Sequence, residues 1–384
     1  MTRHSNIIIS THYLVYGAAQ ALQEYLISEK INKLLYIAHP LNSDSEKKSF
    51  YEVYNLGIRK EKKILINNNS NSIFEYLMTV YKNIKIVYMQ KSKYDLFVGV
   101  NNLNTISGII LRKLGLVDKV IYYTIDFSPK RFNNKLLNYL YHSIDSYCVR
   151  HSNQIWNVSN RIADAREKFN RLHNKYYSKQ KVVPIGIWYD RVKRKPFKEI
   201  KKHQLIFIGN LLEKQGVQHV LNSVPEIVKS IEDFHFIIIG GGEYETYLRG
   251  LAEDLNIEKY VTFTGWVKDR GKLDAMMSDS ALSIAMYDKY DKNGDISFTY
   301  FADPTKLKDY LSAGLPILLT DITHNAHEIE GNKCGKIIKP DHKTISNAVI
   351  EIITNDKKLY EFRKNALAYV KQFEWSEIFR NAGL

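Results

Sequence analysis

The chain lacks most features that would place it outside a reducing compartment. Cysteine occurs only at Cys148 and Cys334 among 384 residues, which fits neither a disulfide framework nor a cysteine metal site. No apolar run approaches the ~20 residues that cross a bilayer. The first apolar run, residues 7–9, is too short for the core of a signal peptide. We therefore expect a reduced cytoplasmic protein.

Acidic residues are also scarce. The chain has 41 Asp and Glu against 55 Lys and Arg, which gives a formal net charge of +14. Such a charge favours an anionic partner, namely a phosphorylated substrate, an anionic membrane or nucleic acid. A compositional bias of the coding genome is an equal alternative, because Lys, Asn, Ile and Tyr are abundant together. The 45% of hydrophobic residues exclude a disordered chain.

Segments of strand and helix character alternate along the chain, which predicts an α/β protein with parallel sheets covered by helices on both faces. A length of 384 residues suggests two domains, and the Pro-, Lys- and Arg-rich stretch 184–203 is typical of a linker. Ligands of doubly wound domains bind at the carboxyl ends of strands. The expected strands are 7–10, 34–38, 84–89, 96–100, 120–125, 154–158, 181–184, 205–208, 234–239, 261–263, 282–285, 316–320 and 335–338. The expected helices are 18–28, 105–114, 136–142, 215–231, 243–255, 269–277, 305–313, 343–353 and 357–380.

Residues 303–316 form the most informative stretch. Pro304 stands where a helix start tolerates proline, and the N–H groups of a helix start bind anions. Thr305 and Lys306 add a hydroxyl and a positive charge, and Asp309 follows one helical turn later on the same face. This combination suits the phosphates and the ribose of a nucleoside diphosphate. An ordinary capped helix between two strands is the alternative.

Three further loops follow expected strands. Gly209 permits a tight exit from one strand, and Lys214 beyond it can neutralise phosphate near a helix start. Gly240 opens a run of three glycines, which is typical either of a phosphate-binding turn or of close packing. Trp266 and Val267 form the third loop, where a nucleobase contact and a packing tryptophan are the two interpretations. The chain has neither a Gly-x-Gly-x-x-Gly fingerprint nor a P-loop in these loops.

The order of these landmarks resembles the donor-binding domain of glycosyltransferase family four, whose members are retaining enzymes with the GT-B fold. That family has Gly-Arg and a lysine after a strand, then Gly-x-Gly, Val-x-Phe-x-Gly-x-Val, a Glu-x7-Glu motif and Gly-x-Pro-Val-Ile. This sequence supplies Gly209 with Lys214, Gly240 with Gly242, Val261-Phe263-Gly265-Val267, and Asp309-Gly314-Pro316-Ile317. The resemblance is strong over residues 205–319 and less specific over the rest of the chain.

The resemblance implies an acceptor-binding Rossmann-like domain at 1–187 and a donor-binding Rossmann-like domain at 188–366. It also implies that the final helix, 367–384, crosses back to the first domain. The implied activity is that of a hexosyltransferase in cell-surface polysaccharide or glycoconjugate synthesis. It transfers a sugar from a nucleoside diphosphate sugar to a hydroxyl of a glycan or lipid-linked acceptor, with retention of configuration. A UDP-sugar is favoured over a GDP-sugar, and no metal and no nucleic acid are expected.

The resemblance also implies roles for individual residues. Lys214 and Lys306 would stabilise the charge on the departing diphosphate. The amides from Pro304 to Lys306, with the Thr305 hydroxyl, would hold the distal phosphate. Asp309 would bind the ribose. The remaining donor-binding candidates are Gly17, Gly209, Asn210, Gly240, Trp266, Val267 and Asp303, of which Trp266 and Val267 would contact the base.

Two positions depart from the family pattern. Asn210 replaces the family arginine, so one phosphate-binding cation is missing. Phe301 stands where the first glutamate of the pair is expected, and Asp303 could substitute for it. The segment is closer to a Pro-x-Lys-x-x-Glu-Tyr variant, with Asp309 and Tyr310 at the last two positions. These departures leave the donor sugar open.

The first half of the chain offers fewer candidates. Gly17 resembles the family's glycine loop near the donor phosphate, with a plain helix start as the alternative. Asp126, after the strand at 120–125, is the candidate for a catalytic or sugar-binding group, and helix capping or turn formation is its alternative. Lys130 and Arg131, with aromatic residues nearby, suit an acceptor at an anionic membrane surface, and an ordinary solvated face competes with that interpretation. The protein would then act at the inner face of the cytoplasmic membrane.

Two other functions remain open. A protein that keeps the fold but has lost transfer, and binds a polyanion or partner instead, would explain the missing arginine and glutamate. A sugar phosphorylase or epimerase of the same fold is the second alternative. Dependence on free phosphate, or formation of an epimer, would reveal it.

Overall fold

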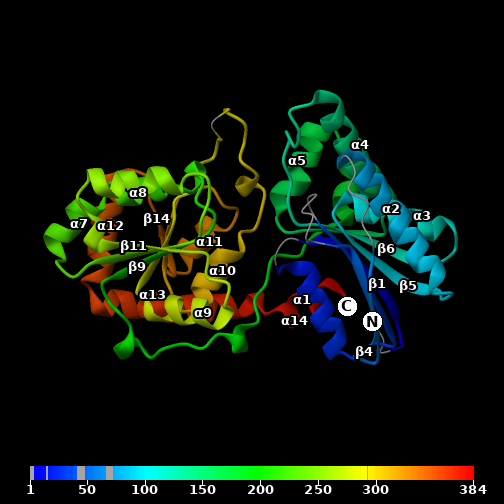
Figure 1. Ribbon diagram of the computed structural model, residues 1–384, viewed down its shortest axis with the longest axis horizontal. Coiled ribbons are helices and arrows are strands. Elements are labelled where there is room, and N and C mark those ends of the chain that lie inside the picture. Colours follow the sequence, from blue (N-terminus) through cyan, green and yellow to red (C-terminus); the bar gives the residue numbers. More distant parts are fainter. Residues whose placement is uncertain (1–3, 14–15, 41–47, 66–71, 292) are drawn as a thin grey trace. The chain divides into compact units, whose positions relative to one another are not determined.

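The computed structural model describes residues 4–13, 16–40, 48–65, 72–291 and 293–384 (Figure 1). The chain divides into two compact units. Unit 1 comprises Met1–Ile185 with Trp375–Leu384, and unit 2 comprises Gly186–Glu374. The final helix therefore belongs to the first unit. Within the described ranges, no helix has the length and apolar character needed to cross a membrane.

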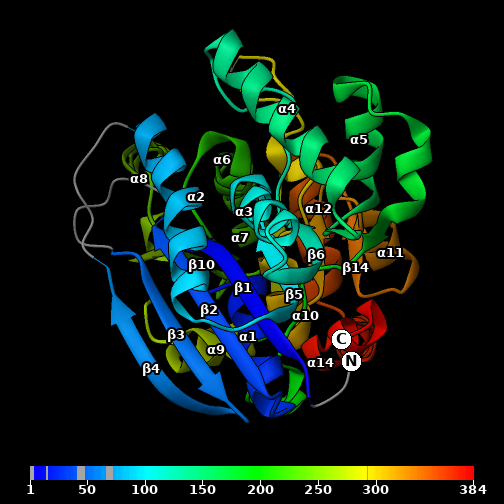
Figure 2. The same ribbon diagram turned by 90° about the vertical axis from the view of Figure 1, so that its right-hand side faces the viewer.

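Unit 1 contains an eight-stranded sheet in the order β4-β3-β2-β1-β5-β6-β7-β8. Figure 2 shows β4, β3, β2 and β1 side by side in this order. β1, β2 and β5 to β8 pair in parallel with their neighbours, whereas β3 pairs antiparallel with both β2 and β4. The strands are β1 (Asn6–Tyr13), β2 (Lys33–Pro40), β3 (Phe50–Asn55), β4 (Ile58–Ile64), β5 (Tyr94–Val100), β6 (Val117–Thr124), β7 (Gln154–Asn157) and β8 (Gln180–Val182). The longer helices are α1 (Ala18–Ser28), α2 (Ser72–Met89), α3 (Asn102–Lys113), α4 (Lys135–His151), α5 (Asn160–Asn170) and α14 (Trp375–Ala382).

The prediction of a strand at 84–89 is wrong, because these residues end helix α2. The buried side chains of α2 include Thr79, Asn83, Ile86 and Val87, a spacing of four, three and one that matches the helical period. A short apolar run at the end of an amphipathic helix has the pattern of a buried strand, and only the spacing of the polar residues before it indicates a helix.

The β3–β4 hairpin was not predicted at all. Its two-residue turn is Leu56-Gly57, with φ of 49° and 81°, the conformation of the tight turns that join twisted antiparallel strands. A Cβ at Gly57 would also lie 2.7 Å from the backbone oxygen of Ile27. β4 is exposed along its whole length, so it lacks the alternating hydrophobic pattern that reveals most antiparallel strands.

Unit 2 contains a parallel six-stranded sheet in the order β11-β10-β9-β12-β13-β14. The chain starts in the middle, builds outward to β11, and returns to build the other side from β12. The point where the order reverses, between β9 and β12, is where ligands bind in doubly wound folds. The strands are β9 (Gln204–Ile208), β10 (His235–Ile239), β11 (Val261–Gly265), β12 (Leu282–Ala285), β13 (Ile317–Leu319) and β14 (Gly335–Ile337).

Helices cover both faces of this sheet, with α8 and α12 on one side and α9 and α13 on the other (Figure 1). The helices are α6 (Val217–Leu221), α7 (Val224–Ser230), α8 (Glu245–Asp254), α9 (Arg270–Asp279), α10 (Thr305–Ser312), α11 (Ala326–Gly331), α12 (His342–Ile353) and α13 (Asp356–Val370). The strands read as continuous apolar runs because a sheet covered on both faces buries both sets of side chains. Phe207, Ile238, Ile284 and Leu318 on four neighbouring strands are all completely buried.

Candidate functional site

The carboxyl ends of β9 and β12 are joined by a close backbone contact. The backbone N–H of Asp288 donates to the oxygen of Lys214 at 3.0 Å. Gly216 has a φ of 70°, and a Cβ there would lie only 1.9 Å from the oxygen of Met286. Glycine at 216 therefore lets the turn after β9, which carries Lys214, lie against the segment that follows β12.

Lys306 on the first turn of α10 points to the same place. Its Nζ donates to Oε1 of Gln215 at 2.6 Å. The same nitrogen lies 4.3 Å from the ring centroid of Phe207 in β9 and 4.6 Å from that of Tyr287 after β12. Among the described residues no carboxylate pairs with Lys306. Burial therefore lowers the pKa of Lys306 to about 7.

Gly209 leaves room for this lysine. Its φ is 146°, a conformation that side chains disfavour, and a Cβ would lie 3.4 Å from Nζ of Lys306. Gly240 has a φ of 134°, and a Cβ there would lie 1.9 Å from the oxygen of Gly209. The end of β10 is thus in tight contact with the turn after β9, which explains Gly240 by close packing. Asn210, beside Gly209, is exposed.

Lys214 is partly buried in the turn after β9. Its Nζ lies 4.3 Å from the ring centroid of Phe298. Burial lowers its pKa, and the nearby charge of Asp291 raises it in part. The structure therefore gathers two lysines, from the turn after β9 and from α10, at the reversal point of the sheet, as the sequence pattern indicates.

The start of α10 exposes Thr305, and Pro304 is its N-cap without a side-chain cap. Asp303 lies behind this turn. Its carboxylate has no exposed surface, forms an ion pair with the fully buried Lys308, and lies 3.3 Å from Nε2 of His324. Phe301 is likewise buried. Asp303 therefore stabilises the loop before α10 and presents no oxygen to solvent.

Asp309 is paired with a residue that sequence reasoning missed. Nη2 of Arg270, on α9, lies 2.7 Å from Oδ1 of Asp309, and Nε of the same arginine lies 2.8 Å from Oδ1 of Asp274. Burial acts to lower the pKa of Arg270, but the charges of Asp309 and Asp274 outweigh it and raise that pKa. Asp309 keeps 17% of its side chain exposed, so it can still accept a hydrogen bond from a ligand.

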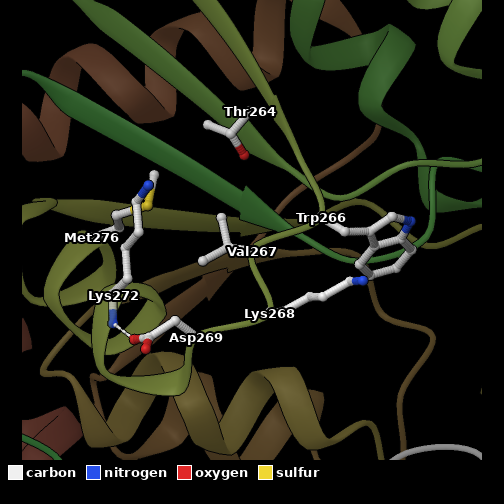
Figure 3. A pocket seen from close by; sticks show the side chains of 7 residues that line it. All are labelled: Thr264, Trp266, Val267, Lys268, Asp269, Lys272 and Met276. Carbon is white, nitrogen blue, oxygen red and sulfur yellow. Dashed lines mark hydrogen bonds between the residues drawn. The ribbon is translucent and has the colours of Figure 1, made fainter.

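A pocket of about 320 Å³ lies beside the start of α9. Figure 3 shows Val267 and Met276 directed toward one another across it, whereas the indole of Trp266 extends to the side. Asp269 caps α9 by accepting from the backbone N–H of Lys272 at 2.6 Å. The indole is 58% exposed, so it is available to a ligand. The full lining is Thr264, Trp266, Val267, Lys268, Asp269, Lys272 and Met276.

The candidates of unit 1 lie at two places, the start of α1 and the loop after β6. Gly17 is the N-cap of α1, where its extended backbone donates to Oε1 of Gln20 at 3.0 Å. Asp126, after β6, forms an ion pair of 2.6 Å with Arg131 in the same loop, and both side chains are about one third exposed. Lys130 is exposed beside them.

Gln215 and Arg270 are the main residues that the sequence did not reveal. Gln215 lies 91 positions from Lys306, and Arg270 lies 39 positions from Asp309. Neither belongs to a local motif. The only available signals were the position of Gln215 directly after Lys214 and that of Arg270 at the start of an expected helix.

The fold has a counterpart among solved structures. The solved structure of HepE from Anabaena in complex with UDP resembles this chain with a TM-score of 0.69 over 98% of each chain, at 14% sequence identity. Likeness at this identity shows the fold alone, and it confirms the predicted GT-B fold.

The sequence comparisons indicate a family for the second half of the chain. Residues 189–369 match the family model described as Glycosyl transferases group 1. The chain is 25% identical over 349 residues to an uncharacterised glycosyltransferase of Methanocaldococcus jannaschii, covering 82% of this chain and 80% of the relative. It is 30% identical over 94 residues to a GDP-mannose-dependent α-(1-6)-phosphatidylinositol monomannoside mannosyltransferase of Mycobacterium tuberculosis, covering 22% and 24%. Residues 189–369 thus belong to the glycosyl transferases of group 1, and the predicted resemblance to glycosyltransferases is confirmed.

Proposed function

We propose that this protein transfers a sugar from a nucleoside diphosphate sugar to a hydroxyl of a glycan or lipid-linked acceptor, with retention of configuration. The observation that carries the proposal is Lys306, a desolvated cation with no carboxylate among the described residues to neutralise it. A diphosphate would supply the missing negative charge.

The chemical role of the two lysines follows from the charge that develops during transfer. As the bond to the sugar breaks, negative charge grows on the departing diphosphate. Lys306, Lys214 and the N–H groups at the start of α10 would stabilise that charge electrostatically. Because Lys306 is desolvated, its interaction with a phosphate is stronger than in water.

The nucleoside would extend from these lysines toward α9. Asp309 would accept a hydrogen bond from a ribose hydroxyl; Arg270 pairs with its carboxylate, part of which stays exposed. The base would occupy the pocket beside Val267 and Trp266. We propose a UDP-sugar as donor, because HepE was solved with UDP. GDP-mannose is the competitor, because the mycobacterial relative is named for it.

We further propose that acceptor binding brings α4 of unit 1 to an anionic membrane, on the cytoplasmic side. Leu136, Tyr139 and Leu140 lie on one face of α4 and are 65%, 69% and 46% exposed. Lys130 and Lys135 lie exposed near the start of this helix. Exposed apolar side chains beside basic ones suit the interface of an anionic lipid surface. The mycobacterial relative, whose name gives a phosphatidylinositol mannoside as acceptor, supports a lipid acceptor.

A thermal-shift screen with UDP-glucose, UDP-N-acetylglucosamine, UDP-galactose and GDP-mannose tests the donor proposal. We expect one nucleotide sugar to raise the unfolding temperature, and mass-detected transfer from that donor should follow with its anomeric configuration retained in the product. A binder of polyanions alone would respond to none of the four. A phosphorylase would need free phosphate, and an epimerase would convert the sugar without an acceptor.

Sedimentation with lipid vesicles tests the membrane proposal. The protein should bind vesicles that contain phosphatidylglycerol and not vesicles of phosphatidylcholine alone. Changing Leu136 and Tyr139 together to Ser should weaken this binding, whereas the same change at Tyr360, an exposed tyrosine of unit 2, should not. Equal binding by both variants would rule out α4 as the contact.

A further inference from the structure

Uncharged polar side chains are buried together at the carboxyl ends of β1 and β5 in unit 1. β1 is the strand from which the chain builds to both sides of its sheet, so this is the reversal point where doubly wound folds bind ligands. The side chains come from β1, β2, α2 and α3 and are 0–1% exposed: Ser10, His39, Asn83, Asn104 and Ser107.

Hydrogen bonds within this cluster satisfy its members. Asn83 lies at the centre: its Nδ2 donates to Oγ of Ser107 at 3.1 Å, and its Oδ1 lies 3.0 Å from Nε2 of His39. Nδ1 of His39 lies 3.1 Å from Oγ of Ser49, and Oγ of Ser10 lies 2.8 Å from Oδ1 of Asn104. Such a saturated network is rigid and holds its members in fixed orientations.

The cluster dictates the protonation of His12 at the end of β1. The carbonyl of Val100 accepts from Nδ2 of Asn104 at 2.9 Å, and Oδ1 of Asn101 accepts from the backbone N–H of Asn104 at 3.3 Å. These backbone groups orient both amides, so each presents Nδ2 to Nδ1 of His12, at 2.9 Å and 3.0 Å. Nδ1 must therefore accept, and the imidazole proton lies on Nε2.

Nε2–H of His12 is a donor that these hydrogen bonds leave without an acceptor among the described residues. His12 is partly exposed, and in the part of the chain that the structure describes nothing accepts from its Nε2. Burial lowers the pKa of His12 to about 4, so the ring is neutral near pH 7. The residue that orients it, Asn101, has φ of 72° and ψ of 169°, a region otherwise reserved for glycine. Strain of this kind concentrates at functional sites.

We propose that His12 is a specificity-determining residue that donates a hydrogen bond from Nε2 to an uncharged oxygen, a hydroxyl or ether, of a sugar or polyol bound by unit 1. Asn101 and Asn104 are positioning residues for this donor. The inference rests on the proposed function and adds to it. No member of the cluster carries a charge, so His12 would bind a hydroxyl in preference to a phosphate. The lysines of unit 2 would prefer the phosphate.

Two variants of His12 separate donation from a structural role. His12→Asn keeps an oxygen near the position of Nδ1, so Asn101 and Asn104 retain their acceptor, but the donor at Nε2 is lost. His12→Gln places an amide N–H near Nε2 and loses the inner acceptor. We expect His12→Asn to fold normally and to raise one KM about 3- to 10-fold, the effect of one hydrogen bond. His12→Gln should stay closer to the wild type.

The KM that changes identifies the sugar. A rise in the acceptor KM places the hydroxyl on the acceptor, and a rise in the donor KM places it on the transferred sugar. The reverse order, with His12→Gln impaired and His12→Asn normal, would overturn the inference and leave the proposed function intact.

A second readout needs no transfer activity. Long-range ¹H–¹⁵N spectra of the wild type should show His12 with its proton on Nε2, and methyl α-glucoside at high concentration should shift that resonance. Inorganic phosphate should not shift it. A proton on Nδ1, a shift with phosphate alone, or no shift with the glycoside would each contradict the inference, whether or not transfer is detected.

Discussion

Each unit contains a desolvated cation, and the two differ in what neutralises them. Arg166 of unit 1 is fully buried, and its guanidinium donates to both oxygens of Asp145, at 2.9 Å and 2.8 Å. Lys306 of unit 2 lies between two aromatic rings, and the acceptor that it has among the described residues is the neutral amide of Gln215. A buried cation that is paired with a carboxylate is neutralised by the fold itself. A buried cation without a carboxylate can be neutralised by an anionic ligand.

The difference also separates the two ends of the proposed reaction. Unit 2 presents charge that suits a diphosphate, and unit 1 presents neutral donors at the reversal point of its sheet. The buried charges of unit 1, Arg166 and Asp145, lie by the ends of β6 and β7 and cancel one another. The formal charge of +14 therefore says less about ligands than the pairing of individual cations does.

The largest effect on stability is expected from breaking the buried ion pair of Arg166 and Asp145. Arg166→Met leaves the carboxylate of Asp145 buried without a counter-charge, so the free energy of unfolding of unit 1 should fall by about 3–5 kcal/mol. Urea denaturation followed by hydrogen exchange of unit 1 peptides measures it. The double variant Arg166→Met, Asp145→Leu should recover part of the loss, and a single-variant cost below about 1 kcal/mol would contradict the account of the pair.

Removing the charge of Lys306 should have the opposite effect: activity should fall while stability is kept. Lys306→Met removes a desolvated charge, so we expect the free energy of unfolding to stay the same or to rise. The kcat/KM for transfer should nevertheless fall about 10²- to 10³-fold, because transition-state charge loses its stabiliser. Lys229→Met, which removes an exposed lysine of α7, is the matched control and should change neither quantity. A large loss of stability in Lys306→Met would mean that the lysine is structural.

A smaller effect is expected at Asp309. Asp309→Asn weakens the acceptor proposed for the ribose, so the Kd for the nucleotide should rise about 10-fold, the lower end for a hydrogen bond to a charged group. Asp274→Asn is the control, because Asp274 pairs with the same Arg270 and is not a proposed ligand contact. Titration calorimetry compares the two. Equal changes in both variants would indicate that Asp309 acts only by holding Arg270.

The sequence predicted the parts of the fold that repeat a simple pattern. Buried parallel strands such as β9 and β12 appear as apolar runs, so the strands of unit 2 and the loops at their carboxyl ends could be predicted. The hydrophobic pattern did not predict elements that bury only one face or none of their side chains. The end of α2 resembled a strand because its last residues are apolar, and β4 could not be predicted because all of its side chains face solvent.

Site residues could be predicted only where they lie together in one segment of the sequence. Thr305, Lys306 and Asp309 lie in one short helix, and Asp309 follows Thr305 by one helical turn, so their spacing alone predicted a shared site. Their partners Gln215 and Arg270 come from distant segments, and only the folded sheet places them there. The cluster around His12 gave no signal, since isolated Asn and Ser residues indicate caps and turns in a sequence. The buried ion pair of Asp303 and Lys308 could not be predicted from the sequence either.

Proton uptake on binding tests the central claim about Lys306 most directly. Because the pKa of Lys306 is about 7 in the free protein and an anion favours the charged form, the nucleotide should bind with uptake of nearly one proton at pH 8. Affinity should therefore fall as pH rises above 7. Titration of UDP in two buffers of different ionisation enthalpy measures the uptake, with Lys306→Arg as a reference that is always charged. Uptake by the wild type and none by Lys306→Arg is the predicted result, and equal proton uptake by both proteins would contradict the claim.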